Sequence, residues 1–457
     1  MAEMTQRIPK RILSGLLSSI SAGVVPRMGA PYIAIGRSEE IEALLGDLEA
    51  VNDGGGSMRF IIGKYGSGKS FLIQLVRGYS LERGFVTADA DLSPERRICG
   101  AKGTGIATYR ELIRNLASKS SPDGGALSQI VAKWLSELQS NVAAEGHEIG
   151  SEAFTRELAA RIYSQTRELE AEVGGFDFAT VLTQYYKAYM DGDEEKKSAC
   201  MRWLRGEYST KTEARNALGA IVGGIIDDDN WYEYIKLLAV FLRKIGYRGL
   251  VVFIDECVNL YKIANRISRE NNYEKLLSMF NDTLQGKAEG LALIFGGTPQ
   301  FLEDTRRGLF SYEALRSRLS DGQFQKAGFK NLIGPVIRLR RLSDDELYAL
   351  IARITNLHGQ NYAWQPRVTN EDMVTFLKIC LDRAGADTMI TPREIIRDYM
   401  TVLNILLQNP DTTFADVVGS GIVRLAHGED DEDAIIVDSE GGKPQIKTDF
   451  SVEDIEI

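Results

Sequence analysis

Residues 63–70 read Gly-Lys-Tyr-Gly-Ser-Gly-Lys-Ser, and their types and spacing suit the binding of an anion. They fit the pattern G-x-x-x-x-G-K-[ST] at every fixed position. Glycines have no Cβ atom, so successive backbone N–H groups in such a segment can point inward at a phosphate. In loops of this type the lysine contacts the β- and γ-phosphates, and the serine hydroxyl binds Mg²⁺. The pattern therefore predicts a loop that binds the phosphates of a nucleoside triphosphate, with Lys69 and Ser70 in these two roles.

The elements on either side of this loop are those that a phosphate-binding loop needs. An apolar run at residues 58–62 predicts a buried strand, and a helix is expected from the loop to Leu81. The positive end of that helix dipole would face the same phosphates. An ordinary glycine-rich turn is the competing interpretation, and the strand before the loop and the helix after it argue against it. The residues predicted to bind nucleotide here are Gly63, Tyr65, Gly66, Ser67, Gly68, Lys69, Ser70 and Phe71.

A second group of candidate residues follows the apolar run 249–254, which ends in Asp255 and Glu256. Strands are often bounded by acidic loop residues, so the pair carries little weight by itself. Beside a phosphate loop, however, Asp255 is suited to hold Mg²⁺ together with Ser70, and Glu256 to activate the attacking water as a general base. The pair therefore predicts ATP hydrolysis, with ATP and Mg²⁺ as the cofactors.

Thr298 is a further candidate because it follows another apolar run, residues 291–295. At the tip of this strand its hydroxyl could orient the attacking water or sense the γ-phosphate. The alternative is that residues 296–298 form only a tight exit from the strand. The predicted catalytic residues are thus Lys69, Glu256 and Thr298.

Five apolar runs predict the strands of one sheet, with helical stretches between them. The runs are residues 58–62, 84–91, 249–254, 291–295 and 335–339. Such strands are typical of an α/β fold in which a parallel sheet is covered on both faces. The chain between the second and third runs is too long for one crossover and shows helical periodicity, so it predicts a helical insertion. Its aromatic residues, such as Trp134 and Trp203, are expected in a core rather than in a ligand cage.

The predicted domains follow from these elements. Residues 1–100 and 247–342 are expected to form a discontinuous P-loop ATPase core, with the helical insertion at 101–246. Residues 343–427 begin with the cap-like Ser-Asp-Asp-Glu and predict a C-terminal helical lid. Residues 428–457 predict a flexible acidic tail. Near the N-terminus Ile8, Ile12, Leu16 and Ile20 recur every four residues, which favours an amphipathic helix over a secretory signal.

With a phosphate loop, an Asp-Glu strand, a polar residue on the next strand and a helical lid, the chain resembles an AAA+ ATPase of the replication-initiator branch. Residues 35–40 resemble the Gly-Arg box of that branch, which implies that Ile35, Gly36 and Arg37 lie near the adenine. Residues 314–319 resemble the segment that supplies an arginine finger to a neighbouring subunit, which implies such a role for Arg316 and Arg318. A solvated helix face is the alternative for these two arginines.

Residues 391–394, Thr-Pro-Arg-Glu, predict the start of a lid helix, with Thr391 as its cap and Pro392 in its first turn. The AAA+ resemblance implies that Arg393, which follows them, binds nucleotide as the second-sensor arginine.

A closer likeness is to the BrxD-type ATP-binding proteins of bacterial anti-phage defence. It is carried by Ser-Ala-Gly-Val-Val-Pro at 21–26 and by the strings GKYGSGKSF, FIDE, GGTP and TPRE. The resemblance implies a role in phage defence within a BREX-like or Shango-like system. It also implies a helicase or another effector of the same operon as partner.

Two functions of different classes are open on this basis. The leading prediction is a motor or switch ATPase that couples ATP binding and hydrolysis to DNA-handling or effector partners, as a homo-oligomer in its ATP state. The alternative is a nucleotide-gated scaffold that recruits effectors with negligible turnover. A small-molecule kinase is disfavoured because the sequence offers no distinct carboxylate for an acceptor site. No guanine-selecting motif is visible, which favours ATP over GTP.

The net charge of −10 is concentrated at the C-terminal end. Residues 428–457 contain eleven acidic residues and two lysines, a net charge of −9, so the rest of the chain is close to neutral. DNA contact by the folded body is therefore neither excluded nor required. The tail interleaves its carboxylates with Phe450, Val452, Ile455 and Ile457. This composition fits either a solubilising end or a peptide that docks on a partner.

No apolar run is long enough to span a bilayer, and no membrane partner is expected. The four cysteines lie far apart without a CxxC pair, as expected of buried thiols in a reducing compartment. A cytoplasmic location is therefore predicted.

Overall fold

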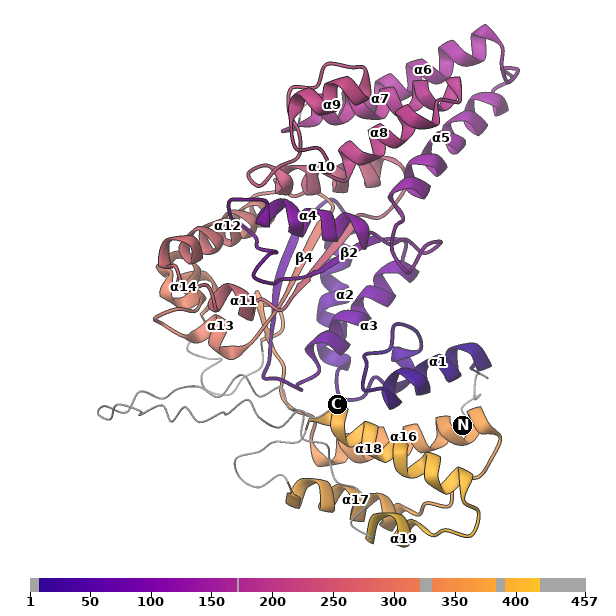
Figure 1. Cartoon of the computed structure of the whole chain (residues 1–457), viewed down its shortest axis with the longest axis vertical. Helices are drawn as coiled ribbons and strands as arrows, with labels where there is room; N and C mark the ends of the chain where they lie inside the picture. The colour runs from indigo at the N-terminus through magenta and orange to yellow at the C-terminus, as the bar shows by residue number, and fades with distance from the viewer. Residues whose placement is uncertain (1–7, 171, 321–330, 384–390, 420–457) are drawn as a thin grey trace, which may run out of the picture.

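The centre of the molecule is a five-stranded, all-parallel sheet with the strand order β2-β3-β4-β1-β5 (Figure 1). The computed structural model describes residues 8–170, 172–320, 331–383 and 391–419. The predicted α/β fold is confirmed, because each strand lies at one of the five predicted apolar runs. The strands are β1 Ser57–Ile62, β2 Val86–Asp91, β3 Leu250–Asp255, β4 Leu291–Gly297 and β5 Val336–Arg338.

Alternate side chains of each strand enter apolar clusters on opposite faces of the sheet. Ile61 and Val251 belong to one cluster, whereas their neighbours Phe60 and Val252 belong to the other. Because helices cover both faces, the strands are apolar throughout instead of alternating with polar residues. The covering helices are α2 Ser38–Asn52 and α3 Lys69–Glu82 on one face, and α4 Thr104–Arg114, α10 Trp231–Lys244 and α12 Arg266–Leu284 on the other.

Between α4 and α10, five helices form an insertion that projects from one end of the sheet (Figure 1). These helices are α5 Leu127–Ala144, α6 Glu152–Arg167, α7 Gly175–Asp191, α8 Glu194–Leu204 and α9 Lys211–Leu218. Trp134 and Trp203 are buried in its core, as predicted. The Asp228 carboxylate accepts hydrogen bonds from the backbone N–H groups of Gly103, Gly105 and Ile106, which ties the end of the insertion to the start of α4.

Short elements lie between α1 and α2 and in the connections from β3 to β4 and from β4 to β5. Three of them, α11, α13 and η2, contact one another or α14 beside the carboxyl end of the sheet. The short elements are η1 Ala30–Ile33, α11 Val258–Tyr261, α13 Pro299–Glu303, η2 Leu309–Ser311 and α14 Glu313–Leu319.

The C-terminal helices form a separate apolar cluster that also contains the first helix of the chain. They are α16 Asp344–Tyr362, α17 Asn370–Arg383, α18 Pro392–Gln408 and α19 Phe414–Gly419. The first helix, α1 Lys10–Ser21, contacts α16 and α18 and buries Leu13, Leu16, Leu17 and Ile20 among their side chains. The predicted amphipathic helix is therefore present, and it packs on the lid.

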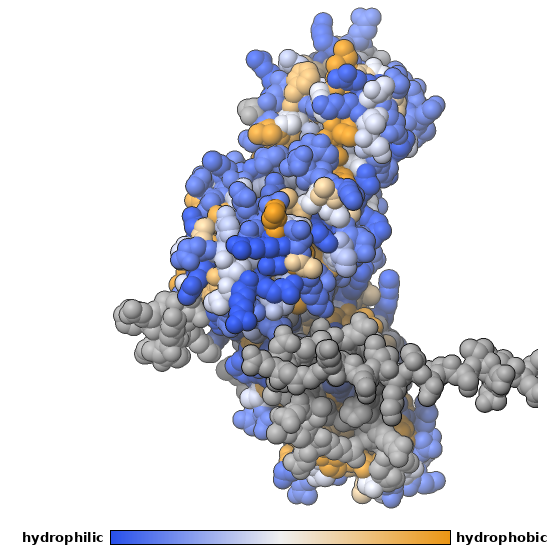
Figure 2. Space-filling view, turned by 60° about the vertical axis from the view of Figure 1, so that its left-hand side comes forward, coloured by the Kyte–Doolittle hydropathy of each residue, from blue (hydrophilic) through white to orange (hydrophobic). Residues whose placement is uncertain are grey.

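The surface is mostly hydrophilic on the side shown in Figure 2, with exposed apolar side chains scattered over the insertion. Among the described residues, no helix combines the length and the apolar character that crossing a membrane requires. Three of the free cysteines, Cys200, Cys257 and Cys380, are buried. The predicted acidic tail at 428–457 lies outside the described residues.

Candidate nucleotide-binding and hydrolytic site

The predicted phosphate loop connects the end of β1 to the start of α3, so Lys69 and Ser70 are the first two residues of that helix. Gly66 and Gly68 have positive φ values of 73° and 89°, a backbone conformation that residues with a Cβ atom rarely adopt. A Cβ on Gly66 would also lie 2.5 Å from Cγ2 of Thr391. Glycine at position 66 thus lets the loop approach the first residues of the lid helix α18.

The side chain of Lys69 folds back over this loop. Its Nζ donates a hydrogen bond of 3.0 Å to the carbonyl oxygen of Gly63. Burial lowers the pKa of the Lys69 ammonium, although the charges of Asp255 and Glu256 oppose that shift. The ammonium is therefore held at the mouth of the loop, close to the two carboxylates at the end of β3.

Ser70 and Asp255 are joined by a hydrogen bond of 2.9 Å from Oγ to Oδ2. The other carboxylate oxygen of Asp255 accepts a bond of 2.8 Å from the backbone N–H of Glu256. Gly296 on the adjacent strand β4 leaves room for this carboxylate, because a Cβ there would lie 2.2 Å from Asp255 Oδ1. A hydroxyl and a carboxylate oxygen are ligands that suit Mg²⁺, so these residues fit the predicted metal.

Glu256 lines the cavity beside the phosphate loop and has an unusual backbone conformation. Its φ is 57°, in the left-handed region that few residues other than glycine adopt. The side chain of Asn259 donates to the carbonyl oxygens of Glu256, at 3.2 Å, and Leu92, at 2.9 Å. Burial raises the pKa of the Glu256 carboxyl, and the charges of Asp255 and Asp91 raise it further.

Asp91 and Asn259 are site residues that the sequence reasoning missed. Asp91 ends β2 and is the register partner of Asp255 on β3. Burial and the charge of Asp255 raise the pKa of the Asp91 carboxyl. The acidic end of the predicted strand 84–91 was a usable signal for Asp91. Asn259 lies in the short helix after Glu256, where nothing in its local sequence distinguishes it.

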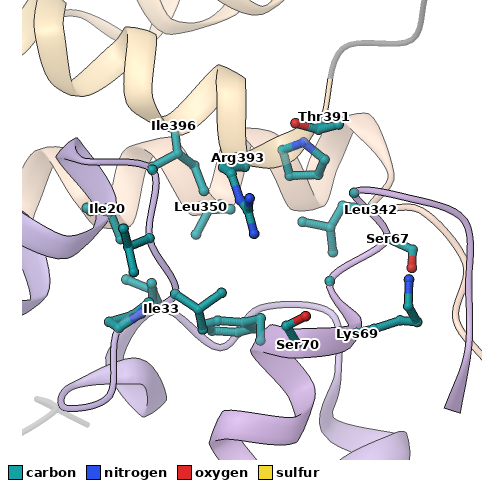
Figure 3. A pocket seen from close by; sticks show the side chains of 18 of the residues that line it. Ile20, Ile33, Ser67, Lys69, Ser70, Leu342, Leu350, Thr391, Arg393 and Ile396 are labelled. Carbon is teal, nitrogen blue, oxygen red and sulfur yellow. The ribbon is translucent and has the colours of Figure 1, made fainter. Parts of the chain in front are cut away.

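A cavity of about 300 Å³ separates the phosphate loop from the lid (Figure 3). Arg393 reaches into it from α18, opposite Ser70 on α3. The side away from Lys69 is apolar and combines residues of α1, the loop after it and the lid. The apolar residues lining the cavity are Ile20, Val24, Val25, Pro26, Ile33, Ile35, Phe71, Leu350, Pro392 and Ile396, together with Leu342, which lies nearer to Ser67 (Figure 3).

Gly36 and Arg37 connect the phosphate loop to the base of the lid. Arg37 is 3% exposed, and its Nη2 donates to the carbonyl oxygens of Ser67, at 2.8 Å, and Arg340, at 2.7 Å. A Cβ on Gly36 would lie 2.5 Å from Oε1 of Glu346. The Arg340 guanidinium, which binds Glu346, lowers the pKa of that carboxyl to about 2. Arg37 lines the cavity, but its hydrogen bonds position the loop backbone and the start of the lid.

Most of the predicted nucleotide-binding residues lie around this one cavity. Gly63 and Gly36 are absent from its lining and instead support Lys69 and the lid, as described above. The predicted site residues that line it are Ile35, Arg37, Tyr65, Gly66, Ser67, Gly68, Lys69, Ser70, Phe71, Glu256 and Arg393.

Four other predicted residues lie outside the lining of the cavity: Asp255, which binds Ser70, and Thr298, Arg316 and Arg318. Thr298 caps α13, where its hydroxyl accepts a bond of 3.3 Å from the backbone N–H of Phe301. Arg316 and Arg318 lie on α14, and Arg318 donates to the carbonyl oxygen of Ala314. The role of an arginine finger toward a neighbouring subunit stays a prediction for these two residues.

A parallel sheet with a glycine-rich loop between β1 and α3, facing acidic residues at the end of β3, defines a P-loop nucleotide-binding protein. A comparison with known families agrees with this class. The family described as BREX system ATP-binding protein BrxC/D matches residues 8–421, and the chain belongs to this family. The predicted resemblance to BrxD-type ATP-binding proteins is thereby confirmed. Among curated proteins, none matches this chain.

Proposed function

We propose that this chain is a Mg²⁺-dependent ATPase that acts as a motor or switch in a bacterial anti-phage defence system. The observation that carries the proposal is the Ser70–Asp255 hydrogen bond of 2.9 Å. It joins the phosphate loop to the carboxylates of β3 across 185 positions of the sequence. Membership of the BREX family supports ATP as the ligand and phage defence as the setting.

ATP would bind with its base in the apolar part of the cavity and its phosphates at the loop. Ile20 and Ile396 supply apolar walls from α1 and from the lid, respectively. Arg393 projects between that region and Ser70, where its positive charge suits the phosphate groups. Lys69 would exchange its bond to the Gly63 carbonyl oxygen for contacts with the phosphates.

For hydrolysis, Ser70 and Asp255 would hold Mg²⁺, which when bound offsets the negative charge of the phosphates. Glu256 would take the proton of the attacking water. Burial and the two neighbouring carboxylates raise the proton affinity of Glu256, which favours this transfer. Thr298 would orient the water, and Arg316 or Arg318 would act on the neighbouring subunit of a homo-oligomer. The cycle would drive a helicase, another effector of the same system, or DNA bound through them, in the cytoplasm.

Replacing Glu256 by Gln tests the catalytic part of the proposal. The variant should lose at least about 100-fold in ATP turnover, because the amide cannot accept the proton, while it keeps the affinity for ATP. Turnover is measured by phosphate release, and affinity by calorimetry. Glu371→Gln, an exposed site on α17, is the matched control and should behave as the parent does.

The same measurements separate the ATPase from a nucleotide-gated scaffold. A scaffold would bind ATP with negligible turnover in the parent chain, even with DNA and operon partners supplied. Equal turnover in the parent and the Glu256→Gln variant would also contradict the ATPase proposal. Lys69→Ala should abolish ATP binding in either case, because the ammonium contact with the phosphates is lost.

A further inference from the structure

A second cleft lies where the insertion meets the ATPase core, between α4, the start of α5 and the segment after α8. It has a volume of about 600 Å³ and is open to solvent. Its charged lining consists of four arginines and two glutamates, a net charge of +2 in a protein whose total charge is −10. These residues are Arg96, Arg110, Arg114, Arg205, Glu111 and Glu207. We call this site the arginine cleft.

The carboxylates of Glu111 and Glu207 can bind only some of the N–H donors of the four arginines. Glu111 pairs with both Arg96, at 3.3 Å, and Arg114. Glu207 lies 3.6 Å from Arg205. The Nε atom of Arg96 is buried and has no hydrogen-bond partner among the described residues. Because each guanidinium carries five N–H donors, the cleft retains capacity for an anion with several oxygens.

We infer that the arginine cleft binds the phosphate backbone of a nucleic acid. The planar fork of an arginine matches the oxygens of a phosphate, and several arginines in one groove can contact successive phosphates. The open form of the cleft admits a chain that continues beyond it. The inference rests on the proposed function for its biological role, and it names nucleic acid as a ligand of this chain itself.

The arginine cleft is connected to the hydrolytic site by one short segment. The chain leaves β2 at Asp91, beside Asp255, and reaches the cleft at Arg96. The arginine cleft and the ATP cavity are therefore joined through the backbone of this segment.

The test compares two double variants of the full chain that remove the same charge. Arg96→Gln/Arg114→Gln removes the two arginines that share Glu111. Arg83→Gln/Arg248→Gln removes two arginines that share Glu49, away from the cleft lining, and is the matched control. Binding of a labelled DNA or RNA strand of about 20 nucleotides is measured by fluorescence anisotropy without ATP, over a range of salt concentrations.

The cleft variant should bind at least about tenfold more weakly, with a smaller salt dependence, because two phosphate contacts are lost. The control should stay within about twofold of the parent. Circular dichroism checks that both variants fold. The single variant Arg114→Gln, which changes a side chain that is 71% exposed, should show a smaller loss in the same direction.

Two results would overturn the inference: a parent chain that does not bind the strand, or equal losses in the cleft and control variants. Competitors identify the ligand chemistry. Inorganic phosphate should displace the strand only weakly. If polyglutamate of equal charge displaces it as well as an unlabelled strand does, the cleft takes acidic peptide and the inference fails. ATP turnover of the parent is measured separately, so a failure of the proposed function is distinguishable from a failure of this inference.

Discussion

Several residues of the proposed hydrolytic site act by leaving space for a neighbouring side chain or by hydrogen-bonding to it. Gly296 leaves the volume in which the Asp255 carboxylate lies, and Ser70 and the backbone of Glu256 each bind one of its oxygens. The side chain of Asn259 donates hydrogen bonds to the backbone carbonyl oxygens of Glu256 and Leu92. The orientation of Asp255 therefore depends on neighbours from three different elements.

Gly296→Ala should abolish most ATP turnover. The added Cβ would lie 2.2 Å from Asp255 Oδ1, so the carboxylate must move away from Ser70. Removal of a metal ligand from its position is expected to cost roughly 10- to 100-fold in metal affinity or activity. Phosphate release as a function of Mg²⁺ concentration measures this loss. Gly78→Ala on α3, where a Cβ meets no atom within 4 Å, is the control and should keep parental turnover; equal activity in both variants would contradict the explanation.

The local sequence was sufficient to place some of these residues and insufficient for others. Lys69 and Ser70 could be predicted because the phosphate loop is a continuous pattern, and Asp255 because it follows an apolar strand. The acidic end of residues 84–91 was a signal for Asp91, but its position beside Asp255 could not be predicted, because it depends on β2 lying next to β3, and strand order is not encoded in any one segment. The contacts of Arg37 with Ser67 and Arg340 depend likewise on tertiary packing.

At the scale of elements, two helices of the lid start with the same reciprocal cap. Ser343 caps α16 and Thr391 caps α18, and in each a glutamate three residues later bonds back to the cap residue. Both starts were predictable because a cap uses only neighbouring residues. Only the cap of α18 touches the phosphate loop, through the methyl group of Thr391 beside Gly66.

Thr391→Ala and Ser343→Ala should therefore have equal effects on stability and different effects on binding. Each should lose about 1 kcal/mol in the free energy of unfolding, because one backbone N–H loses its side-chain acceptor. Only Thr391→Ala should also weaken ATP binding. Denaturant unfolding and calorimetry measure the two quantities. Thr391→Ser should restore the cap without the methyl contact; if it binds ATP as weakly as Thr391→Ala does, the contact matters more than the cap.

His358 gives the lid a dependence on pH. Its Nδ1 accepts a bond of 3.0 Å from Trp364 Nε1, and its Nε2 lies 3.1 Å from Asn404 Oδ1. Burial lowers the pKa of this imidazole below 6.5, although the bond to Asn404 opposes the shift. The unfolded chain therefore takes up the proton first as the pH falls. The stabilisation is present above pH 6.5 and is lost as the pH falls toward the lower folded value.

Thermal unfolding should accordingly show a midpoint that falls as the pH is lowered below 6.5. His358→Gln should reduce that dependence, because no proton can then be taken up at this position. His147→Gln, in the loop after α5, should keep the dependence of the parent. A parental pH profile in the His358→Gln variant would show that other groups cause the effect.

Helices and strands with a clear pattern in their own residues were predictable, whereas the elements that they pack against were less predictable. The strands followed from apolar runs, and α5 from a helical stripe that includes Trp134 and Leu138. The amphipathic pattern of α1 showed that it must pack on something, but periodicity cannot identify the partner. The lid that covers α1 lies more than 300 positions further along the chain.

For the whole molecule, the packing of α1 on the lid joins the two ends of the described chain above one ligand cavity. Leu16 of α1 is fully buried in the apolar cluster that this helix forms with the lid. Ile20 of the same helix lines the cavity. The wall opposite the phosphate loop is thus built from residues that are distant in sequence. Loosening this packing should affect both stability and nucleotide binding.

Leu16→Ala should destabilise the protein by about 2–5 kcal/mol, because it opens a space in a packed cluster. It should also weaken ATP binding, since α1 carries part of the cavity wall. Thermal unfolding and calorimetry check the two effects. Ile267→Ala, at a side chain that is 70% exposed on α12, should stay within about 0.5 kcal/mol of the parent. A Leu16→Ala variant with parental ATP affinity would show that α1 does not shape the cavity.

The place of β1 in the sheet has a consequence for how the protein is made. Its neighbours are β4 and β5, so the strand that carries the phosphate loop has no partner until Leu291–Gly297 has left the ribosome. At about 5–20 residues per second, that interval after Ile62 is roughly 10–45 s. During that time the apolar β1 lacks its sheet partners, and an unpaired apolar strand is prone to associate with other chains. The nucleotide site is thus among the last parts of the molecule that synthesis allows to assemble.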